Sequence, residues 1–350
     1  MPALDLIQPG EPGTFTGGYI YNRRLLGMLA ARGWRTRLQP LHTSFPTPTS
    51  AALEEARQVF CSIPAQRLVL VDGLALGGIP DLLEREAQRL RLLALVHHPL
   101  ALETGLPAAT AAALQQAERR ALAAVRGVIV TSHATARALA AYAVPPSRIG
   151  VVQPGTDRAA AARGSGGEVL ELLCVATVTP RKGHALLIEA LGSLSEHRWR
   201  LTCVGSLQRC PATVAALRRQ ISALRLDASV RLLGEVDAAR LASCYQRADL
   251  FVLPSYHEGY GMALAEAVAH ALPVVSTQAG AIAETLPAGA GVLVPPGDSA
   301  ALAAALDRLL EEPELRQRLA QGAAAARAAL PDWAQAGRRF AAEIQRLVPA

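Results

Sequence analysis

The sequence lacks a long apolar run, and this absence excludes several classes of protein. No stretch of about 20 strongly apolar residues occurs, which argues against a membrane-spanning helix. The N-terminal MPALDLIQPGEPG has neither the basic start nor the apolar centre of a signal peptide. We therefore expect a soluble, unexported protein, and its 350 residues are enough for two domains of ordinary size.

Cysteines are few and unpaired. The five of them, Cys61, Cys174, Cys203, Cys210 and Cys244, are an odd number without a CxxC pair. Most lie in apolar segments, where a free thiol behaves as a small hydrophobic side chain. We expect buried thiols rather than disulfides or metal ligands, as is usual in a reducing cytoplasm.

Aromatic residues are also scarce, at 4% of the chain, whereas the formal net charge is +6. The arginines that supply most of this excess are dispersed, with no basic stripe interleaved with aromatic side chains. We therefore expect no nucleic-acid partner. The charge favours an anionic partner, such as a phosphorylated ligand or an acidic membrane face, although a mildly basic surface without such a partner is the alternative.

Short apolar runs alternate with helical patterns along the whole chain. The predicted strands of the first half are residues 3–7, 34–41, 67–73, 91–98, 127–132 and 149–155. Those of the second half are residues 169–177, 200–206, 229–236, 249–255, 273–277 and 290–298. The clearest helical pattern runs from Tyr19 to Arg32 and stops at Gly33. This alternation predicts an α/β fold of two doubly wound, Rossmann-like domains with parallel sheets covered on both faces.

A segment without apolar periodicity separates the two halves. Residues 157–168, DRAAAARGSGGE, are small, polar and glycine-rich, as in a linker. We predict an N-terminal domain in residues 1–156, a C-terminal domain in residues 169–331 and a final helix in residues 332–350. Because ligands of open α/β sheets bind beyond the carboxyl ends of the strands, we expect the two domains to face a central cleft.

Two places in the first half suit a polar ligand. Gly17 and Gly18, in TFTGGYIYN, precede the first long helix and leave backbone N–H groups open to a phosphate or sugar, although an ordinary turn explains them equally well. They do not form the GxGxxG fingerprint, which argues against a nicotinamide or flavin enzyme. His97 and His98 end a predicted strand, where either could bond a hydroxyl or accept a proton, or be purely structural.

Two neighbouring cations stand out in VATVTPRKGHALLIEAL. Arg181 and Lys182 follow a strand, and Gly183 opens a helix. The helix dipole disfavours adjacent cations at this end unless an anion lies between them and the helix. We interpret the pair as the site of a diphosphate, with arginine bonding as a fork and lysine as a point charge. A solvated basic turn is the alternative.

Two glutamates lie eight positions apart in PSYHEGYGMALAEAVAH. Gly259 and Gly261 surround a predicted helix start, whose N–H groups suit an anion. We expect Glu258 to lie at the mouth of the site and Glu266 to be buried about one turn into the helix. A buried carboxylate is costly unless it is bonded, and the hydroxyls of a ribose would bond it. The alternatives are a surface Glu258 and a capping or salt-bridged Glu266.

In combination these segments resemble the GT-B glycosyltransferases, specifically the large retaining group known as family four, or glycosyl transferases group 1. EGYGMALAE matches the E-x7-E motif of that family through Glu258 and Glu266. VATVTPRKG, VVQPGTD, RLLGEVDAARLASCYQRADLFVLPS and the segment that follows the motif match as well. The resemblance covers nearly all of the second half and, more loosely, the first.

The resemblance implies a role for each candidate residue. Arg181 and Lys182 would hold the donor diphosphate, Glu266 the ribose hydroxyls and Glu258 the donor sugar. One of the two histidines would touch the sugar; we favour His97, which directly follows the apolar strand, and His98 is the alternative. Glu258, His97, Arg181 and Lys182 are therefore the expected catalytic residues. The remaining donor-binding residues implied are Gly17, Gly18, Gly259, Gly261, Met262 and Ala263.

The family also implies a reaction: transfer of a hexosyl group from a nucleotide-diphosphate sugar with retention at the anomeric carbon. The leaving diphosphate would accept the proton of the acceptor. The sequence contains no D-x-D motif, so we expect neither a metal nor a further cofactor. The N-terminal domain would bind the acceptor, and the final helix would cross back onto that domain.

The acceptor stays open: a polysaccharide, a lipid carrier or a small molecule. The basic balance permits a lipid-linked acceptor and peripheral contact with the inner face of a membrane. The alternatives to a transferase are another GT-B activity, such as a sugar-nucleotide epimerase or a phosphorylase, and a non-catalytic sugar-nucleotide-binding or scaffold protein.

Overall fold

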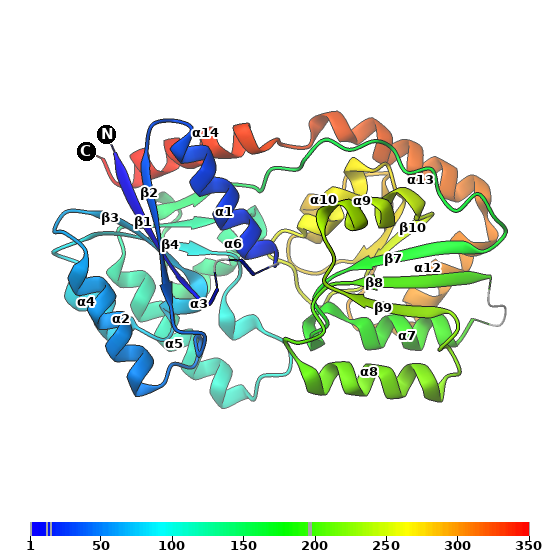
Figure 1. Ribbon diagram of the computed structural model, residues 1–350, viewed down its shortest axis with the longest axis horizontal. Helices are drawn as coiled ribbons and strands as arrows, with labels where there is room; N and C mark the ends of the chain where they lie inside the picture. Colours follow the sequence, from blue (N-terminus) through cyan, green and yellow to red (C-terminus); the bar gives the residue numbers. More distant parts are fainter. Residues whose placement is uncertain (1, 12, 15, 195–197, 350) are drawn as a thin grey trace. The chain divides into compact units, whose positions relative to one another are not determined.

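The computed structural model describes residues 2–11, 13–14, 16–194 and 198–349, and the chain divides into two compact units (Figure 1). Unit 1 comprises Met1–Gly155 and Pro331–Ala350, and unit 2 comprises Thr156–Leu330. Among the described residues each unit contains one six-stranded sheet, and every strand pairing in both sheets is parallel. Helices accompany both sheets, so the predicted α/β fold with two doubly wound domains is confirmed.

The sheet of unit 1 has the strand order β2-β1-β3-β4-β5-β6. Its strands β3, β4 and β5 are almost continuously buried, as expected for a parallel sheet covered on both faces, whereas β2 is an edge strand with alternating exposure. The strand bounds are β1 (Ala3–Pro9), β2 (Arg35–Leu41), β3 (Leu68–Asp72), β4 (Arg91–Val96), β5 (Gly127–Val130) and β6 (Ile149–Val151).

Helices α1 and α14 lie together on one face of this sheet (Figure 1). The long helices of unit 1 are α1 (Gly17–Ala30), α2 (Ser50–Ser62), α5 (Ala108–Ala124) and α14 (Trp333–Leu347), and the shorter ones are α3 (Gly73–Leu76), α4 (Pro80–Glu86) and α6 (His133–Ala138). Helix α14 starts with a capping box between Asp332 and Gln335. Gly337 lets α14 approach α1 closely, because an added Cβ would lie 2.5 Å from Cβ of Met28.

The start of α1 corrects one prediction. The helix runs over Gly17–Ala30 rather than from Tyr19 to Arg32, so Gly17 and Gly18 form its first turn and do not precede it. The apolar periodicity, which begins at Tyr19, cannot reveal this turn because glycine contributes nothing to the pattern. The consequence is that the N–H groups of both glycines belong to a helix N-terminus, which leaves them without intrahelical acceptors.

The sheet of unit 2 has the order β12-β11-β10-β7-β8-β9. Its strands are β7 (Leu170–Val175), β8 (Trp199–Val204), β9 (Val230–Gly234), β10 (Leu250–Leu253), β11 (Val274–Thr277) and β12 (Gly291–Val294). Its helices are α7 (His184–Gly192), α8 (Pro211–Ala223), α9 (Ala238–Arg247), α10 (Met262–Ala269), α11 (Ile282–Thr285), α12 (Ser299–Glu311) and α13 (Pro313–Ala326). Helices α7, α8 and α12 cover one face and α9, α10 and α13 the other (Figure 1).

Residues 157–168 have almost no regular secondary structure and lie along unit 2. The N–H groups of Ala162 and Arg163 donate to the carbonyl oxygens of His270 and Gln246 at 2.7 and 2.8 Å. The carboxylate of Asp249 accepts from the N–H of Ser165 at 3.0 Å. Several main-chain groups of the segment therefore bond to unit 2.

The cysteines are all free, but only two of them are buried. Cys174 and Cys203 are buried, Cys210 and Cys244 are partly exposed, and Cys61 is exposed. The expectation of buried thiols is thus wrong for Cys61, which follows the fully buried Phe60 on α2 and so lies about 100° further round the helix. Among the described residues, none of the helices combines the length and the apolar character that crossing a membrane requires.

Candidate functional site

The predicted charged residues of unit 2 meet at the point where the strand order reverses. After β7 the chain adds β8 and β9 on one side, and then places β10 on the other side of β7. Such a switch point opens a crevice at the carboxyl ends of the two strands, where ligands of doubly wound sheets bind. Lys182 follows β7 and Glu258 follows β10, and the N–H of Tyr256 donates to the carbonyl oxygen of Arg181 at 2.8 Å. The two loops therefore form one structure.

Glu258 is the centre of a buried ion cluster. Its Oε1 accepts hydrogen bonds from Nζ of Lys182 and from Oγ of Ser255, both at 2.6 Å. Arg181 lies 3.9 Å from the other carboxylate oxygen and donates to the carbonyl oxygen of His257 at 2.8 Å. Only 6% of Glu258 is exposed. The first anion beside the two cations is thus a carboxylate of the protein itself.

The burial of the two glutamates is the reverse of the prediction. Glu258, expected at the open mouth of the site, is buried, whereas Glu266, expected inside apolar surroundings, is partly exposed. Helix α10 begins at Met262, as predicted, and its alanines and Val268 are mostly buried. Glu266 lies on the side of the helix that faces α9, where Oε2 accepts a hydrogen bond from the hydroxyl of Tyr245 at 2.9 Å.

The pKa shifts in the cluster follow from its charge count. Burial alone raises the pKa of Glu258, but the charges of Lys182 and Arg181 and the hydrogen bonds of Lys182 and Ser255 outweigh it, so the pKa lies below its ordinary value. Burial lowers the pKa of Lys182, and Glu258 opposes this only in part because Arg181 adds to the lowering. The two shifts are compatible: one carboxylate with two cations is amply stabilised, whereas the two cations share one anion.

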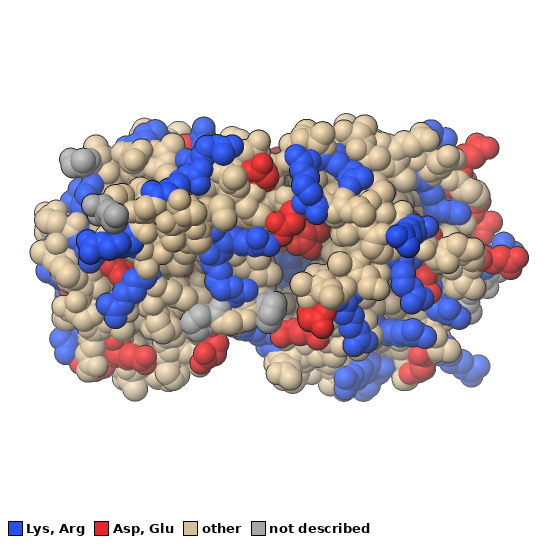
Figure 2. All heavy atoms as spheres, turned by 45° about the horizontal axis from the view of Figure 1, so that its top comes forward, with Lys and Arg blue, Asp and Glu red and all other residues tan. Residues whose placement is uncertain are grey.

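Lys182 is unusual in this chain because of its residue type. It is the only lysine of the chain, and every other basic residue among the 35 Lys and Arg is arginine. A compact ammonium is a point charge that readily changes its pKa when buried, and arginine lacks both features. The residue type alone therefore sets position 182 apart from the arginines, which are scattered over the visible surface (Figure 2).

The N-terminus of α10 adds backbone donors on the same loop. Gly261 is the N-cap with φ +94°, and the N–H groups of Met262 and Ala263 open the helix without intrahelical acceptors. Together with Gly259, these residues lie between the two glutamates. A helix N-terminus of this kind stabilises an anion through its dipole and its N–H groups.

A neighbouring glycine holds the main chain of Glu258 in place. The carbonyl oxygen of Glu258 accepts from the N–H of Ala281 at 2.9 Å, and Gly280 packs directly against it. An added Cβ at Gly280 would lie 2.2 Å from that oxygen, and the φ of +58° disfavours any other residue. Gly280 is therefore required for the position of Glu258.

In unit 1 the predicted residues gather at the corresponding switch point, between β1 and β3. An added Cβ on Gly18 would lie 3.2 Å from the ring of His97, so the first turn of α1 and the end of β4 are in contact. His97 Nε2 lies 3.2 Å from Oδ1 of Asn22 and 3.7 Å from Oδ2 of Asp72. His98 instead lies 3.3 Å from Oε2 of Glu103. Of the two histidines, His97 therefore lies against Gly18.

The buried polar groups beneath His97 form a connected network. Asn22 donates to Gln8 at 2.6 Å and to Asp72 at 2.7 Å. Among the described residues, Nε2 of Gln8, which is 1% exposed, has no hydrogen-bond partner. Buried polar groups are usually satisfied, so this unpaired donor is unusual for a core.

Several residues with a clear place in the two sites were not singled out from the sequence. The structure adds Ser255, Tyr245 and Gly280 in unit 2, and Gln8, Asn22 and Asp72 in unit 1. A signal existed for Asp72, which ends an apolar strand with an acidic residue, and for Gln8 near the end of β1. Tyr245 and Asn22 lie within helices, and nothing in their local patterns distinguishes them.

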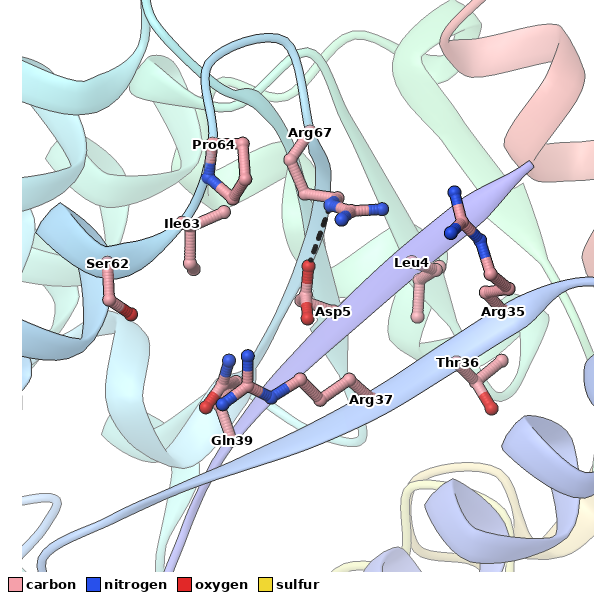
Figure 3. Close-up of a pocket in the computed structure, with 10 residues that line it drawn as sticks. All are labelled: Leu4, Asp5, Arg35, Thr36, Arg37, Gln39, Ser62, Ile63, Pro64 and Arg67. Atoms are coloured by element: carbon pink, nitrogen blue, oxygen red, sulfur yellow. Dashed lines mark ion pairs between the residues drawn. The ribbon is translucent and has the colours of Figure 1, made fainter. Parts of the chain in front are cut away.

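A pocket of about 250 Å³ in unit 1 contains none of the predicted residues (Figure 3). It lies near the starts of β1 and β2, away from the carboxyl ends of the strands, and Arg67 contacts Asp5 there at 3.1 Å. Since ligands of parallel sheets bind at the opposite ends, this pocket is not the predicted site.

Comparison with known proteins supports the resemblance. A model described as glycosyl transferases group 1 matches residues 157–326, and one described as glycosyltransferase family 4 matches residues 71–160. The two matches together span residues 71–326 and confirm the resemblance. The chain is thus similar to the family-four glycosyltransferases along most of its length. The first match contains the whole ion cluster of unit 2, and the second contains Asp72 and His97.

Curated relatives resemble part of the chain. D-inositol 3-phosphate glycosyltransferase from Thermomonospora curvata is 32% identical over 206 residues, which are 52% of this chain and 48% of the relative. Phosphatidyl-myo-inositol mannosyltransferase from Mycobacterium leprae is 38% identical over 156 residues, 42% of this chain and 39% of the relative. The matched part of the chain spans about half the length of the first of these relatives.

Solved structures match over almost the whole chain. Sucrose-phosphate synthase from Thermosynechococcus elongatus superimposes with a TM-score of 0.83 at 22% identity, covering 99% of both chains. Alr3699/HepE from Anabaena, in complex with UDP and glucose, gives a TM-score of 0.76 at 18% identity, covering 97% of this chain and 99% of that one. At these identities the likeness concerns the fold, and it confirms the GT-B class.

Proposed function

We propose that the chain is a retaining, metal-independent glycosyltransferase that moves a hexosyl group from a nucleotide-diphosphate sugar to an acceptor. The observation that carries the proposal is the cluster of Arg181, Lys182 and Glu258 at the switch point of unit 2. Retention and metal independence are proposed from the family resemblance and from the absence of a D-x-D motif. The family and its folds support the class of reaction.

The charge of the cluster explains why a diphosphate suits it. Two cations surround one carboxylate, which leaves an excess positive charge in a largely buried place. A diphosphate would supply the missing negative charge and would offset the burial cost that lowers the pKa of Lys182. Positive charge placed beforehand around a departing phosphate is also the main way in which a transferase lowers its barrier.

We assign the remaining donor contacts to Glu266 and the start of α10. Glu266 takes the ribose hydroxyls, and the hydroxyl of Tyr245 holds its carboxylate in position at 2.9 Å. The N–H groups at Met262 and Ala263 take a phosphate oxygen or a sugar hydroxyl, as do those of Gly17 and Gly18 in unit 1. Glu258 and His97 contact the donor sugar, each held by its own network.

The descriptions of the similar proteins suggest which nucleotide and which class of acceptor to test first. HepE is described in complexes with UDP and with UDP-glucose, so UDP is the first nucleotide to test. Two relatives bear names that refer to inositol phosphates, which fits the net charge of +6 and makes a phosphorylated acceptor the first class to test. Peripheral contact with the inner membrane face and a cytoplasmic location belong to the same proposal, and sedimentation with anionic vesicles tests the contact.

The single lysine gives a direct test of the donor site. Acetylation of the native protein followed by peptide mass spectrometry reports on Lys182 alone, because the α-amino group is the only other primary amine. We expect UDP and UDP-glucose to protect Lys182 and NAD to leave it reactive. Equal labelling of Lys182 with and without UDP and GDP nucleotides would contradict the proposal.

Measurement of turnover then distinguishes a transferase from an epimerase and from a binding or scaffold protein. Incubation of UDP-glucose and other UDP- and GDP-sugars without acceptor should release the nucleotide slowly, and Lys182→Ala should abolish the release. A protein that converts the donor sugar into its epimer is an epimerase. Protection of Lys182 without release of nucleotide, even with acceptors present, would favour a binding or scaffold protein.

A further inference from the structure

Unit 2 contains a second cluster of chemically competent side chains, close in sequence to the turn that carries Arg181 and Lys182. Cys174 on β7 and Cys203 on β8 are direct register partners, and His184 is the first residue of α7. Their exposures are 0%, 3% and 2%. The two sulfur atoms and an imidazole nitrogen all lie within 4.8 Å of one another.

The spacing of these atoms is close to that of metal ligands. Zn–S and Zn–N bonds of about 2.3 and 2.0 Å at tetrahedral angles place a sulfur and a nitrogen roughly 3.6 Å apart, and two sulfurs roughly 3.8 Å apart. Sγ of Cys174 lies 3.7 Å from Nε2 of His184. Only small side-chain movements would therefore bring all three atoms onto one ion.

The ring of His184 points Nε2 at one of the two thiols. Nδ1 of His184 is buried and has no hydrogen-bond partner among the residues that the structure describes. The polar contact that orients the imidazole is the one to Cys174.

We propose that Cys174, Cys203 and His184 form a binding site for a soft metal ion, Zn²⁺ or Cu⁺, held by two thiolates and one imidazole. Thiolate ligands select these ions, whereas Mg²⁺ and Mn²⁺ require oxygen ligands. Three protein ligands leave one position open on Zn²⁺ or complete a trigonal Cu⁺ site. Each thiol releases its proton on binding. This inference departs from the expectation that these cysteines are ordinary buried thiols, and it gives the ion no part in sugar transfer.

The test uses the full chain with Cys61, Cys210 and Cys244 replaced by serine, so that only the two proposed thiols remain. None of the three replaced residues is buried. After reduction and anaerobic desalting, Cd²⁺ serves as the probe, because thiolate-to-cadmium charge transfer absorbs in the ultraviolet. We expect saturation at one equivalent, displacement by Zn²⁺ and no displacement by Mg²⁺.

Variants in this background locate the ion. Cys174→Ser and Cys203→Ser should each lower the absorption, and His184→Gln should weaken Cd²⁺ binding at least about tenfold, since even outer-shell changes have that effect. If these buried variants fail to fold, the parent protein, in which only Cys61, Cys210 and Cys244 are replaced, still tests the proposal. A folded parent without thiolate absorption at one equivalent of Cd²⁺, or absorption that survives in the Cys174→Ser/Cys203→Ser variant, would overturn the site. No nucleotide is involved, so failure here leaves the proposed transferase untouched.

Discussion

Replacement of Lys182 by methionine tests the ion cluster through stability. Methionine keeps most of the length of the side chain but leaves Glu258 with the hydroxyl of Ser255 at 2.6 Å and with Arg181 at 3.9 Å. Removing one partner of a buried ion pair typically costs about 3–5 kcal/mol. We expect the lower end, because the burial cost of the lysine disappears with it.

Protonation of Glu258 limits this loss and makes it depend on pH. Neutralising a carboxyl of ordinary pKa near 4.3 costs about 1.36 kcal/mol per pH unit, or roughly 3.7 kcal/mol near pH 7 and about 1 kcal/mol near pH 5. In the wild type the lowered pKa of Glu258 contributes stability that is present above its ordinary pKa and is lost as the pH falls through the lowered one. The destabilisation by Lys182→Met should therefore shrink from about 3–4 kcal/mol near pH 7 to about 1 kcal/mol near pH 5.

Urea unfolding followed by tryptophan fluorescence measures this difference within unit 2. Of the three tryptophans only Trp199 belongs to unit 2, so a background with Trp34→Phe and Trp333→Phe isolates its signal. Arg200→Met is the matched control, because Arg200 is 53% exposed and pairs with Glu171 at 3.6 Å, so a loss below about 1 kcal/mol is expected. A loss for Lys182→Met no larger than that of the control, or equal at both pH values, would refute the reasoning.

Four further predictions concern binding and turnover of UDP-sugars. Glu258→Gln should bind UDP roughly fivefold tighter by calorimetry, because the cations lose a charged competitor worth about 1 kcal/mol, while turnover falls; weaker binding would contradict this. The affinity of the wild type for UDP should decline as the pH rises through the lowered pKa of Lys182, below the ordinary value of about 10.4, and Lys182→Arg should lack that decline. Tyr245→Phe should weaken UDP binding roughly threefold to tenfold through the lost hydrogen bond to Glu266; unchanged affinity would separate Glu266 from the ribose. Gly280→Ala should lower the free energy of unfolding by at least about 1–2 kcal/mol and abolish turnover, and full activity would show that the main chain of Glu258 tolerates displacement.

The strands and the sheet type followed from the sequence because apolar β-branched runs record burial on both faces of a parallel sheet. All twelve predicted strand segments overlap a strand of the described structure. Most predictions extended too far at the carboxyl end, as in residues 91–98, where β4 stops at Val96. The residues predicted beyond the strand ends, such as His97, belong to the loops that carry the candidate sites. Apolar residues adjoin them in the sequence, so the hydrophobic pattern does not reveal where the strand ends.

The burial of the two glutamates could not be predicted because it depends on contacts distant in the sequence. Glu258 lies among glycines and a histidine, a context typical of an exposed loop, yet Lys182, which is 76 positions away, buries it. Glu266 lies among alanines and Val268, a context typical of a core, yet its side of α10 faces Tyr245 of α9. A local sequence pattern indicates how buried a helix or a loop is on average. It does not indicate which side of that helix or loop remains exposed after its neighbours have packed against it.

The choice of lysine at position 182 has a geometric reason within the cluster. Oε1 of Glu258 accepts hydrogen bonds from Ser255 and Lys182 at the same distance of 2.6 Å, so it offers the cation a single acceptor direction. A guanidinium donates through a rigid planar fork that suits two adjacent acceptors, whereas an ammonium can point one N–H at the carboxylate and turn the other two towards a second anion. Arginine serves at every other basic position of the chain, and the neighbouring Arg181 bonds a carbonyl oxygen instead. The position that bonds an internal carboxylate, and that we propose to bond an incoming phosphate, is thus the one that holds the point charge.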